Sequence, residues 1–210
     1  MKKLIPLLLV VLTFAACEKD PDTDKLDNKY LVYTNYDTKA DFKAFQTYYM
    51  PDSILIIGDK KEAEYWKDES AQEILQAYAT NMNNRGFVRV DDREEANLGL
   101  QVSYIKSTYY FNDYRRPEWW WNYPGYWDAP YWGNWGGWYY PYAVTYTYST
   151  GSFITELLNL EATQGEKEKL PVLWTSYMSG LLSGSTSVNT KLAIEGVNQA
   201  YTQSSYLTNK

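Results

Sequence analysis

The sequence contains no histidine and a single cysteine among its 210 residues. The absence of histidine removes the most common general base, the Ser-His-Asp arrangement and most zinc sites. The chain also lacks the GxSxG pattern of a nucleophile elbow and the glycine-rich loop that binds phosphate. We therefore predict that the protein is not an enzyme, has no catalytic residue, and uses neither a metal nor a cofactor.

Positive charge is in the minority. Lys and Arg number 20 against 26 Asp and Glu, so the formal net charge is −6 at pH 7. Proteins that bind nucleic acid need a basic surface, and so do proteins that charge alone holds on anionic lipid. The composition therefore excludes nucleic acid as a partner and excludes a purely electrostatic hold on a membrane.

One apolar run stands at the N-terminus, over residues 4–16. It is too short to span a bilayer, which takes about 20 apolar residues. The run follows the basic start MKK and ends in small residues, which is the pattern of a secretory signal. We predict that residues 1–16 are a signal peptide.

The single cysteine, Cys17, directly follows this run. The stretch FAAC (residues 14–17) resembles the lipobox of bacterial lipoproteins, with Phe14 in place of the usual Leu. The resemblance implies cleavage before Cys17 and a thiol alkylated with diacylglycerol, so that acyl chains such as palmitate anchor the protein. The alternative is an ordinary secretory signal with a stray cysteine, but the position of the only cysteine favours lipidation. Since two or three acyl chains hold a protein stably, we predict a lipid-anchored protein of the cell envelope, at the outer membrane, with the leaflet left open.

The domain boundaries follow from composition. Residues 17–29 comprise Cys17 and the acidic, polar sequence EKDPDTDKLDNK, which has nothing to bury and is typical of a tether. Its start, EKD, resembles the charged export tag of surface lipoproteins of the Bacteroidetes. We predict a single domain over residues 30–203, with a Trp/Tyr-rich insertion at residues 110–142 and a C-terminal tail at residues 204–210.

Hydrophobic periodicity predicts two helices and a series of strands. Apolar residues recur at helical spacing over residues 68–85, where Asp68 can cap the start and Gly86 can close the end. A second helix is predicted over residues 187–203. Strands are predicted at residues 30–34, 47–50, 87–90, 98–109, 143–148, 153–160 and 172–178, and residues 53–57 form an apolar stretch of undecided type.

These elements predict an α+β two-layer sandwich. Short links between the later strands favour antiparallel pairing, so the sheet should be mostly antiparallel. Two amphipathic helices would cover one face of it, and a long aromatic loop would leave one end. Apolar residues alternate with small or polar ones over residues 98–104, which predicts a strand buried on one face only.

The segment Pro117–Tyr142 is the most unusual part of the sequence. It holds seven Trp and six Tyr in 26 residues, interrupted by four Gly and four Pro. The Gly and Pro residues exclude a long helix or a regular strand. The segment has no Leu, Ile or Val, so it would make a poor ordinary core. It is therefore predicted to be a long loop between two strands.

Two interpretations of this segment stay open. Its rings can fold back over the exposed face of the sheet and meet Tyr104, Tyr146 and Tyr148, because so many exposed aromatics would favour aggregation. Alternatively they bind a glycan or a protein partner, since flat rings with a polar edge stack on sugars and form hot spots at interfaces. The predicted binding residues are Trp119, Trp120, Trp121, Trp127, Trp132, Trp135, Trp138, Tyr123, Tyr126 and Tyr131.

Two further roles compete with glycan or protein binding, and a low-complexity, aggregation-prone sequence is another interpretation of the segment. Aromatic rings also gather at membrane–water boundaries, so the loop can dock the lipid-anchored domain on a membrane surface. A pair of carboxylates can hydrolyse a polysaccharide, and Glu118 and Asp128 are the acids inside the segment. We favour the binding or structural role, because two acids in such a loop most simply keep it soluble.

Three stretches resemble a known family. They are VYTNYDTKADFKAFQTYYM (residues 32–50), RGFVRVDDREEANLGLQVSY (residues 85–104), and GSFITELLNL with LPVLWTSYMSG (residues 151–160 and 170–180). This pattern of strands, acidic link and central Trp is similar to the domain of unknown function 4136, found in envelope lipoproteins of Bacteroidetes-type bacteria. The resemblance implies the fold and the location but transfers no catalytic residue, because the matching motifs are structural.

Overall fold

The computed structural model describes residues 30–58, 62–106, 129–132, 137–144, 150–162, 169–181 and 186–210. The predicted signal peptide, Cys17 and the tether lie outside these residues. Within the described part of the chain, no helix combines the length and the apolar character needed to cross a bilayer.

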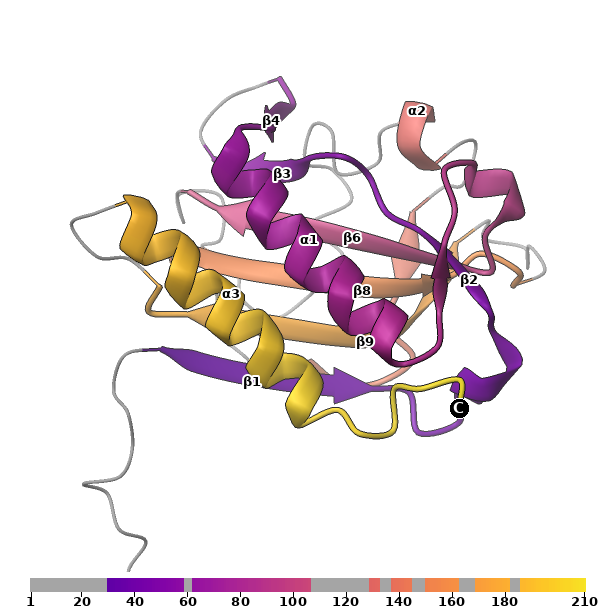
Figure 1. The fold of residues 1–210 in the computed structure, drawn as a ribbon. Coiled ribbons are helices and arrows are strands. Elements are labelled where there is room, and N and C mark those ends of the chain that lie inside the picture. The colour runs from indigo at the N-terminus through magenta and orange to yellow at the C-terminus, as the bar shows by residue number, and fades with distance from the viewer. Residues whose placement is uncertain are drawn as a thin grey trace, which may run out of the picture.

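The long strands form the antiparallel centre of the sheet. Their spatial order is β1 (Leu31–Tyr36), β9 (Leu170–Ser179), β8 (Ser152–Asn159) and β6 (Leu98–Ile105). Each of these neighbours pairs antiparallel. Figure 1 shows these strands as adjacent ribbons behind the two long helices. The prediction of antiparallel pairing among the later strands is confirmed.

Short strands extend the sheet beyond β6, and here the pairing is mixed. Strands β2 (Thr47–Tyr49) and β3 (Ile54–Ile57) both pair parallel with β6, one after the other along its edge. Pro51 lies between them, where its missing N–H interrupts the ladder. Strand β5 (Val88–Arg89) pairs parallel with β2, and β4 (Glu64–Trp66) pairs antiparallel with β3. The stretch of undecided type is therefore a strand.

Two helices cover one face of the sheet, as predicted. Helices α1 (Glu69–Asn84) and α3 (Thr186–Thr202) lie side by side across it (Figure 1). The Asp68 side chain accepts a hydrogen bond from the Ala71 N–H at 3.1 Å, which caps α1. Gly86 follows α1 with φ at 93°, a left-handed conformation that glycine adopts without strain. The fold class, α+β, is confirmed.

The core between helices and sheet is closed by residues near the C-terminus. Trp174 is fully buried and donates its indole N–H to Ser204 Oγ at 2.9 Å. Leu207 is also buried, and the Tyr206 ring stacks on Tyr36 with centroids 3.7 Å apart. The sequence analysis ends the domain at residue 203, whereas these residues pack as part of it.

The opposite face of the sheet, called here the outer face, carries a second buried cluster. It is covered by helix α2 (Ala129–Trp132) and strand β7 (Trp138–Tyr139), which pairs parallel with the start of β9. The cluster consists of Leu55, Ile57, Ile105, Trp132, Trp138, Ile154, Leu158, Leu170, Val172 and Tyr177.

The outer cluster corrects one prediction. Strand β6 was expected to be buried on one face only, but Gln101 is 4% exposed and Ser103 is fully buried. The small and polar residues of β6 face the outer cluster, where residues of the aromatic segment replace water. Of the strand predicted at residues 143–148, residues 143–144 are not in a strand, and the rest lie outside the described residues.

Candidate functional site

A row of polar residues crosses the outer face, one on each of four neighbouring strands. Gln101 of β6 lies opposite Glu156 of β8, Glu156 lies opposite Thr175 of β9, and Thr175 lies opposite Asn35 of β1. We call these four residues the polar row. Residues at matching register positions point to the same face of a sheet, and three of the four bond to residues of the aromatic segment or its end.

Trp132, at the end of α2, docks at one end of the polar row. It is 1% exposed and donates its indole N–H to Gln101 Oε1 at 2.9 Å. Its ring lies over Gly99, where an added Cβ would overlap the ring atoms. Tyr49 packs against the ring edge-on, with centroids 5.8 Å apart. A glycine near the start of β6 thus makes room for a tryptophan that comes from another part of the chain.

Trp138 and Tyr140 dock at the centre of the row. Trp138 is fully buried and donates its indole N–H to Glu156 Oε1 at 3.1 Å. The Tyr140 hydroxyl donates to the same carboxylate oxygen. The Trp132 and Trp138 rings meet edge to face, with centroids 6.3 Å apart. One oxygen atom of the fully buried Glu156 side chain therefore accepts hydrogen bonds from both residues.

The end of the aromatic segment is held by β1. Asn35 donates its side-chain N–H to the Ala143 carbonyl oxygen at 2.9 Å. Tyr142 lies between this point and Tyr140, whose ring it meets edge to face at 5.8 Å. From Trp132 to Ala143 the described part of the segment thus crosses the sheet from β6 to β1, following the polar row.

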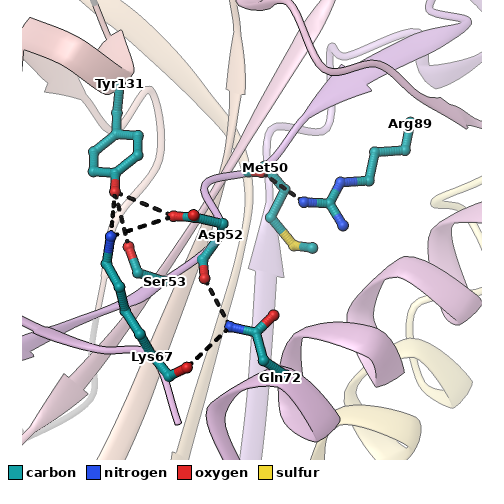
Figure 2. A network of polar contacts seen from close by, with 7 residues as sticks. All are labelled: Met50, Asp52, Ser53, Lys67, Gln72, Arg89 and Tyr131. Atoms are coloured by element: carbon teal, nitrogen blue, oxygen red, sulfur yellow. Dashed lines mark hydrogen bonds and ion pairs between the residues drawn. The ribbon is translucent and has the colours of Figure 1, made fainter. Parts of the chain in front are cut away.

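A second set of contacts, drawn in Figure 2, ties α2 to the edge of the sheet. The Tyr131 hydroxyl lies 3.2 Å from both Asp52 Oδ1 and Ser53 Oγ. Lys67 Nζ donates to the Tyr131 hydroxyl at 3.3 Å and lies 3.7 Å from Asp52 Oδ1. Asp52 and Lys67 are largely exposed, whereas Ser53 is buried. The Tyr131 hydroxyl thus lies in a network that is open to water on one side.

The charges of this network do not suit a nucleophilic lysine. The hydrogen bond to Tyr131 and the proximity of that hydroxyl raise the pKa of Lys67. A nucleophilic lysine needs a lowered pKa, so Lys67 keeps its proton and acts as a cation. Burial likewise raises the pKa of Tyr49, whose hydroxyl stays neutral. The network has the chemistry of an anchor and of a polar contact surface.

The buried carboxylate of Glu156 is engaged by two rings of the aromatic segment. It is fully buried, and one of its oxygens accepts from both Trp138 and Tyr140. A glycosidase needs two carboxyl groups that reach the same bond of a substrate. The acids proposed for that role, Glu118 and Asp128, lie outside the described residues. Within the described part of the chain, no group of three or more acidic or cysteine side chains is placed to hold a metal ion.

Three of the ten predicted binding rings fall on described residues. Trp132 and Trp138 are buried in the outer cluster, and Tyr131 is half-buried at its rim. Two of the three are therefore closed to a ligand at the surface, because their rings pack on the sheet and their N–H groups are already bonded. The other predicted rings, Trp119, Trp120, Trp121, Trp127, Trp135, Tyr123 and Tyr126, lie outside the described residues.

The two described indoles follow the alternative of rings packed on the sheet, but their partners differ from the predicted ones. Tyr104 was expected to meet them, yet its ring points to the helix side and packs against Phe153 with centroids 5.0 Å apart. Tyr146 and Tyr148 lie outside the described residues. The side chains that receive the indoles, Gln101 and Glu156, were not singled out in the sequence analysis, although both interrupt apolar strands.

These features define a class of protein: an α+β domain with helices on one face of a mixed sheet and an aromatic segment docked on the other. The profile of the family described as domain of unknown function, DUF4136, matches residues 32–204, and the chain belongs to this family. The resemblance inferred from the sequence is thereby confirmed.

A solved structure of the same family agrees with this assignment. The 1.60 Å crystal structure of a DUF4136 family protein from Bacteroides thetaiotaomicron VPI-5482 is 62% identical in sequence. It covers 88% of this chain and 100% of its own, with a TM-score of 0.80. A PelC dodecamer from Paraburkholderia phytofirmans is 13% identical, covers 82% of this chain and 97% of its own, and has a TM-score of 0.36, too low to carry an argument. No curated protein matches the sequence.

Proposed function

We propose that the protein is a lipid-anchored module of the cell envelope that binds a glycan or a protein partner through its aromatic segment, without catalysis. The binding rings are Trp119, Trp120, Trp121, Trp127, Trp135, Tyr123 and Tyr126, with Tyr131 at the rim of the sheet. Trp132 and Trp138 serve as anchors that hold the segment on the outer face.

The observation that carries this proposal is the docking of the two indoles on the polar row. Trp132 bonds to Gln101 and Trp138 bonds to Glu156, and both tryptophans are buried. The sheet thus contains acceptors for Trp132 and Trp138, two residues of this segment. Fixing a binding segment at several points lowers the entropy that it loses when a ligand binds.

The location at the envelope rests on the sequence around Cys17. A Cys17→Ser change removes the thiol that the acyl chains need, so we expect the variant protein to leave the membrane fraction and to lack the mass of the lipid. Membrane fractionation with mass spectrometry measures both effects. A variant that stays in the membrane fraction would count against the lipid anchor.

Binding is tested with the Cys17→Ser chain and a panel of envelope polysaccharides. We expect saturable quenching of tryptophan fluorescence without release of sugar products. Changing Trp119, Trp120 and Trp121 together to Ala should weaken this binding, whereas the control Trp66→Phe, on the helix side of the sheet, should not. Product release that is lost on a Glu118→Gln or Asp128→Asn change would instead support the polysaccharide hydrolase.

The same protein variants distinguish a protein partner from a membrane surface. Retention of the wild-type chain on envelope proteins, lost in the triple tryptophan variant, identifies the partner as protein. Flotation of the Cys17→Ser chain with lipid vesicles would instead support docking on a membrane. If the triple variant equals the wild type in every one of these assays, the proposed role of the segment is wrong.

A further inference from the structure

The helix side of the sheet contains a cavity lined by described residues outside the aromatic segment. Its volume is about 310 Å³, and its walls come from β3, β4, β6, β8 and the two long helices. Ligand pockets of proteins span roughly 300–1,000 Å³ and are lined mainly by apolar side chains with a few polar groups. The cavity has the size of a site for a small molecule.

The wall of the cavity is apolar. Three rings contribute to it: Trp66 meets Tyr104 edge to face with centroids 5.7 Å apart, and Tyr104 lies 5.0 Å from Phe153. Aliphatic side chains of Ile56, Ile74 and Leu181 complete the lining. Carbohydrate needs many hydrogen-bonding partners along its hydroxyl groups, which this wall does not offer. The lining fits an apolar body such as a hydrocarbon chain.

Polar groups meet at the rim of the same cavity. Lys106 lines it from the end of β6, and Asn189 and Thr190 line it from the beginning of α3. Lys106 Nζ lies 3.7 Å from Glu64 Oε1, which is longer than a hydrogen bond, and the lysine side chain is 57% exposed. A loose, exposed ion pair of this kind leaves the ammonium able to turn toward an incoming anion.

We propose that this cavity binds a small amphipathic carboxylate, with its hydrocarbon body against the three rings and its carboxylate at Lys106. The ammonium of Lys106 donates to the carboxylate at the rim of the cavity. The residues that carry this proposal lie outside the aromatic segment, so the experiment below tests it independently of the function proposed above.

The test compares amphiphiles that share one chain and differ in their head group. Decanoate, decanol and decylamine are titrated into the Cys17→Ser chain by calorimetry, below the concentrations at which they aggregate. We expect saturable binding with decanoate tightest. A Lys106→Gln change should weaken decanoate about two- to fivefold, as an exposed ion pair would, and leave decanol unchanged. The control Lys191→Gln, on an exposed position of α3, should change neither.

A second variant tests the cavity itself. Ile56 is half-buried in β3, and Ile56→Trp fills the cavity from this position. The variant should therefore bind none of the three amphiphiles while circular dichroism shows a folded chain. The triple variant at Trp119, Trp120 and Trp121 should bind decanoate as the wild type does. Absence of saturable decanoate binding, or equal decanoate affinity of the Lys106→Gln and Lys191→Gln variants, would overturn the proposal. If Ile56→Trp fails to fold, the comparison of the two lysine variants decides.

Discussion

Some residues of the sheet are explained by the side chains that pack against them. Gly99 interrupts the apolar strand β6, and the Trp132 ring occupies the space that a side chain would fill. Each residue is unfavourable by itself, because a glycine weakens a strand and a buried indole needs an acceptor for its N–H. Together they let the aromatic segment approach the backbone of the sheet and reach Gln101.

A methyl group at Gly99 should therefore loosen the segment. Gly99→Ala forces the Trp132 ring away, and we expect a loss of about 1–3 kcal/mol in the free energy of unfolding, as in other overpacked sites. The matched control is Gly58→Ala, because a Cβ there meets only Lys106 at 3.7 Å; its effect should stay within about 1 kcal/mol. Urea denaturation measures both variants. Equal stability of the two would show that Trp132 does not rest on Gly99.

Buried tyrosines make the stability sensitive to alkaline pH. Burial raises the pKa of Tyr48 from 10.0 to about 12, and burial also raises the pKa of Tyr78 and Tyr201. In the unfolded chain a tyrosine ionises near pH 10, while in the folded chain Tyr48 keeps its proton. The stabilising contribution is thus complete below pH 10 and is lost as the pH rises from 10 to 12.

Unfolding measured at pH 9 and pH 11 tests this. Ionisation of Tyr48 alone should lower the free energy of unfolding by about 1.4 kcal/mol at pH 11, since one pKa unit corresponds to that free energy. In Tyr48→Phe the drop between the two pH values should be smaller by about this amount, whatever the stability of the variant at pH 9. A drop of the same size in wild type and variant would mean that Tyr48 ionises as easily in the fold as outside it.

The secondary elements divide into those that local pattern determines and those that depend on distant partners. Helix α1 belongs to the first kind: its apolar stripe, the Asp68 cap and Gly86 are all visible in the sequence, and the structure confirms each. Elements α2 and β7 belong to the second kind. They are short, and they lie where Trp132 and Trp138 bond to the polar row and β7 pairs with the start of β9.

The outer face shows why the local sequence pattern did not predict the burial of both faces of β6. Alternation in β6 predicted a face open to water, because polar residues in a strand usually mark the solvent side. Gln101 and Glu156 instead accept hydrogen bonds from buried indoles, a role that no local pattern distinguishes from solvation. The signal available in the sequence was the isolated acid in the otherwise apolar stretch FITELLNL, which a buried strand tolerates only with partners for that acid.

Glu156 is the natural place to test the docking of β7. Glu156→Leu leaves the Trp138 N–H and the Tyr140 hydroxyl without this acceptor, and each unsatisfied buried donor costs roughly 1–3 kcal/mol. We expect a loss of about 2–5 kcal/mol in unfolding free energy. Glu156→Gln keeps an oxygen acceptor of the same shape and should lose less. A Leu variant as stable as the Gln variant would show that the carboxylate does not hold the segment.

The whole molecule is a sheet with two differently used faces. The helix side holds the larger core and the cavity lined by Trp66, Tyr104 and Phe153, and the outer side carries the docked part of the aromatic segment. The fold class and the family followed from the sequence because they depend on periodicity and on long matching stretches. The site followed only in part: composition located the aromatic segment, but it could not separate anchoring rings from contacting ones, since both are Trp and Tyr.

The central claim is that the segment uses Trp132 and Trp138 as anchors and offers its other indoles to a ligand. Oxidation of accessible indoles by N-bromosuccinimide, mapped by mass spectrometry on the folded Cys17→Ser chain, tests it most directly. The account predicts early modification of Trp119, Trp120, Trp121, Trp127 and Trp135, with Trp132 and Trp138 protected as fully as the core residue Trp174. Protection of the first five indoles to the same degree as Trp174 would contradict it.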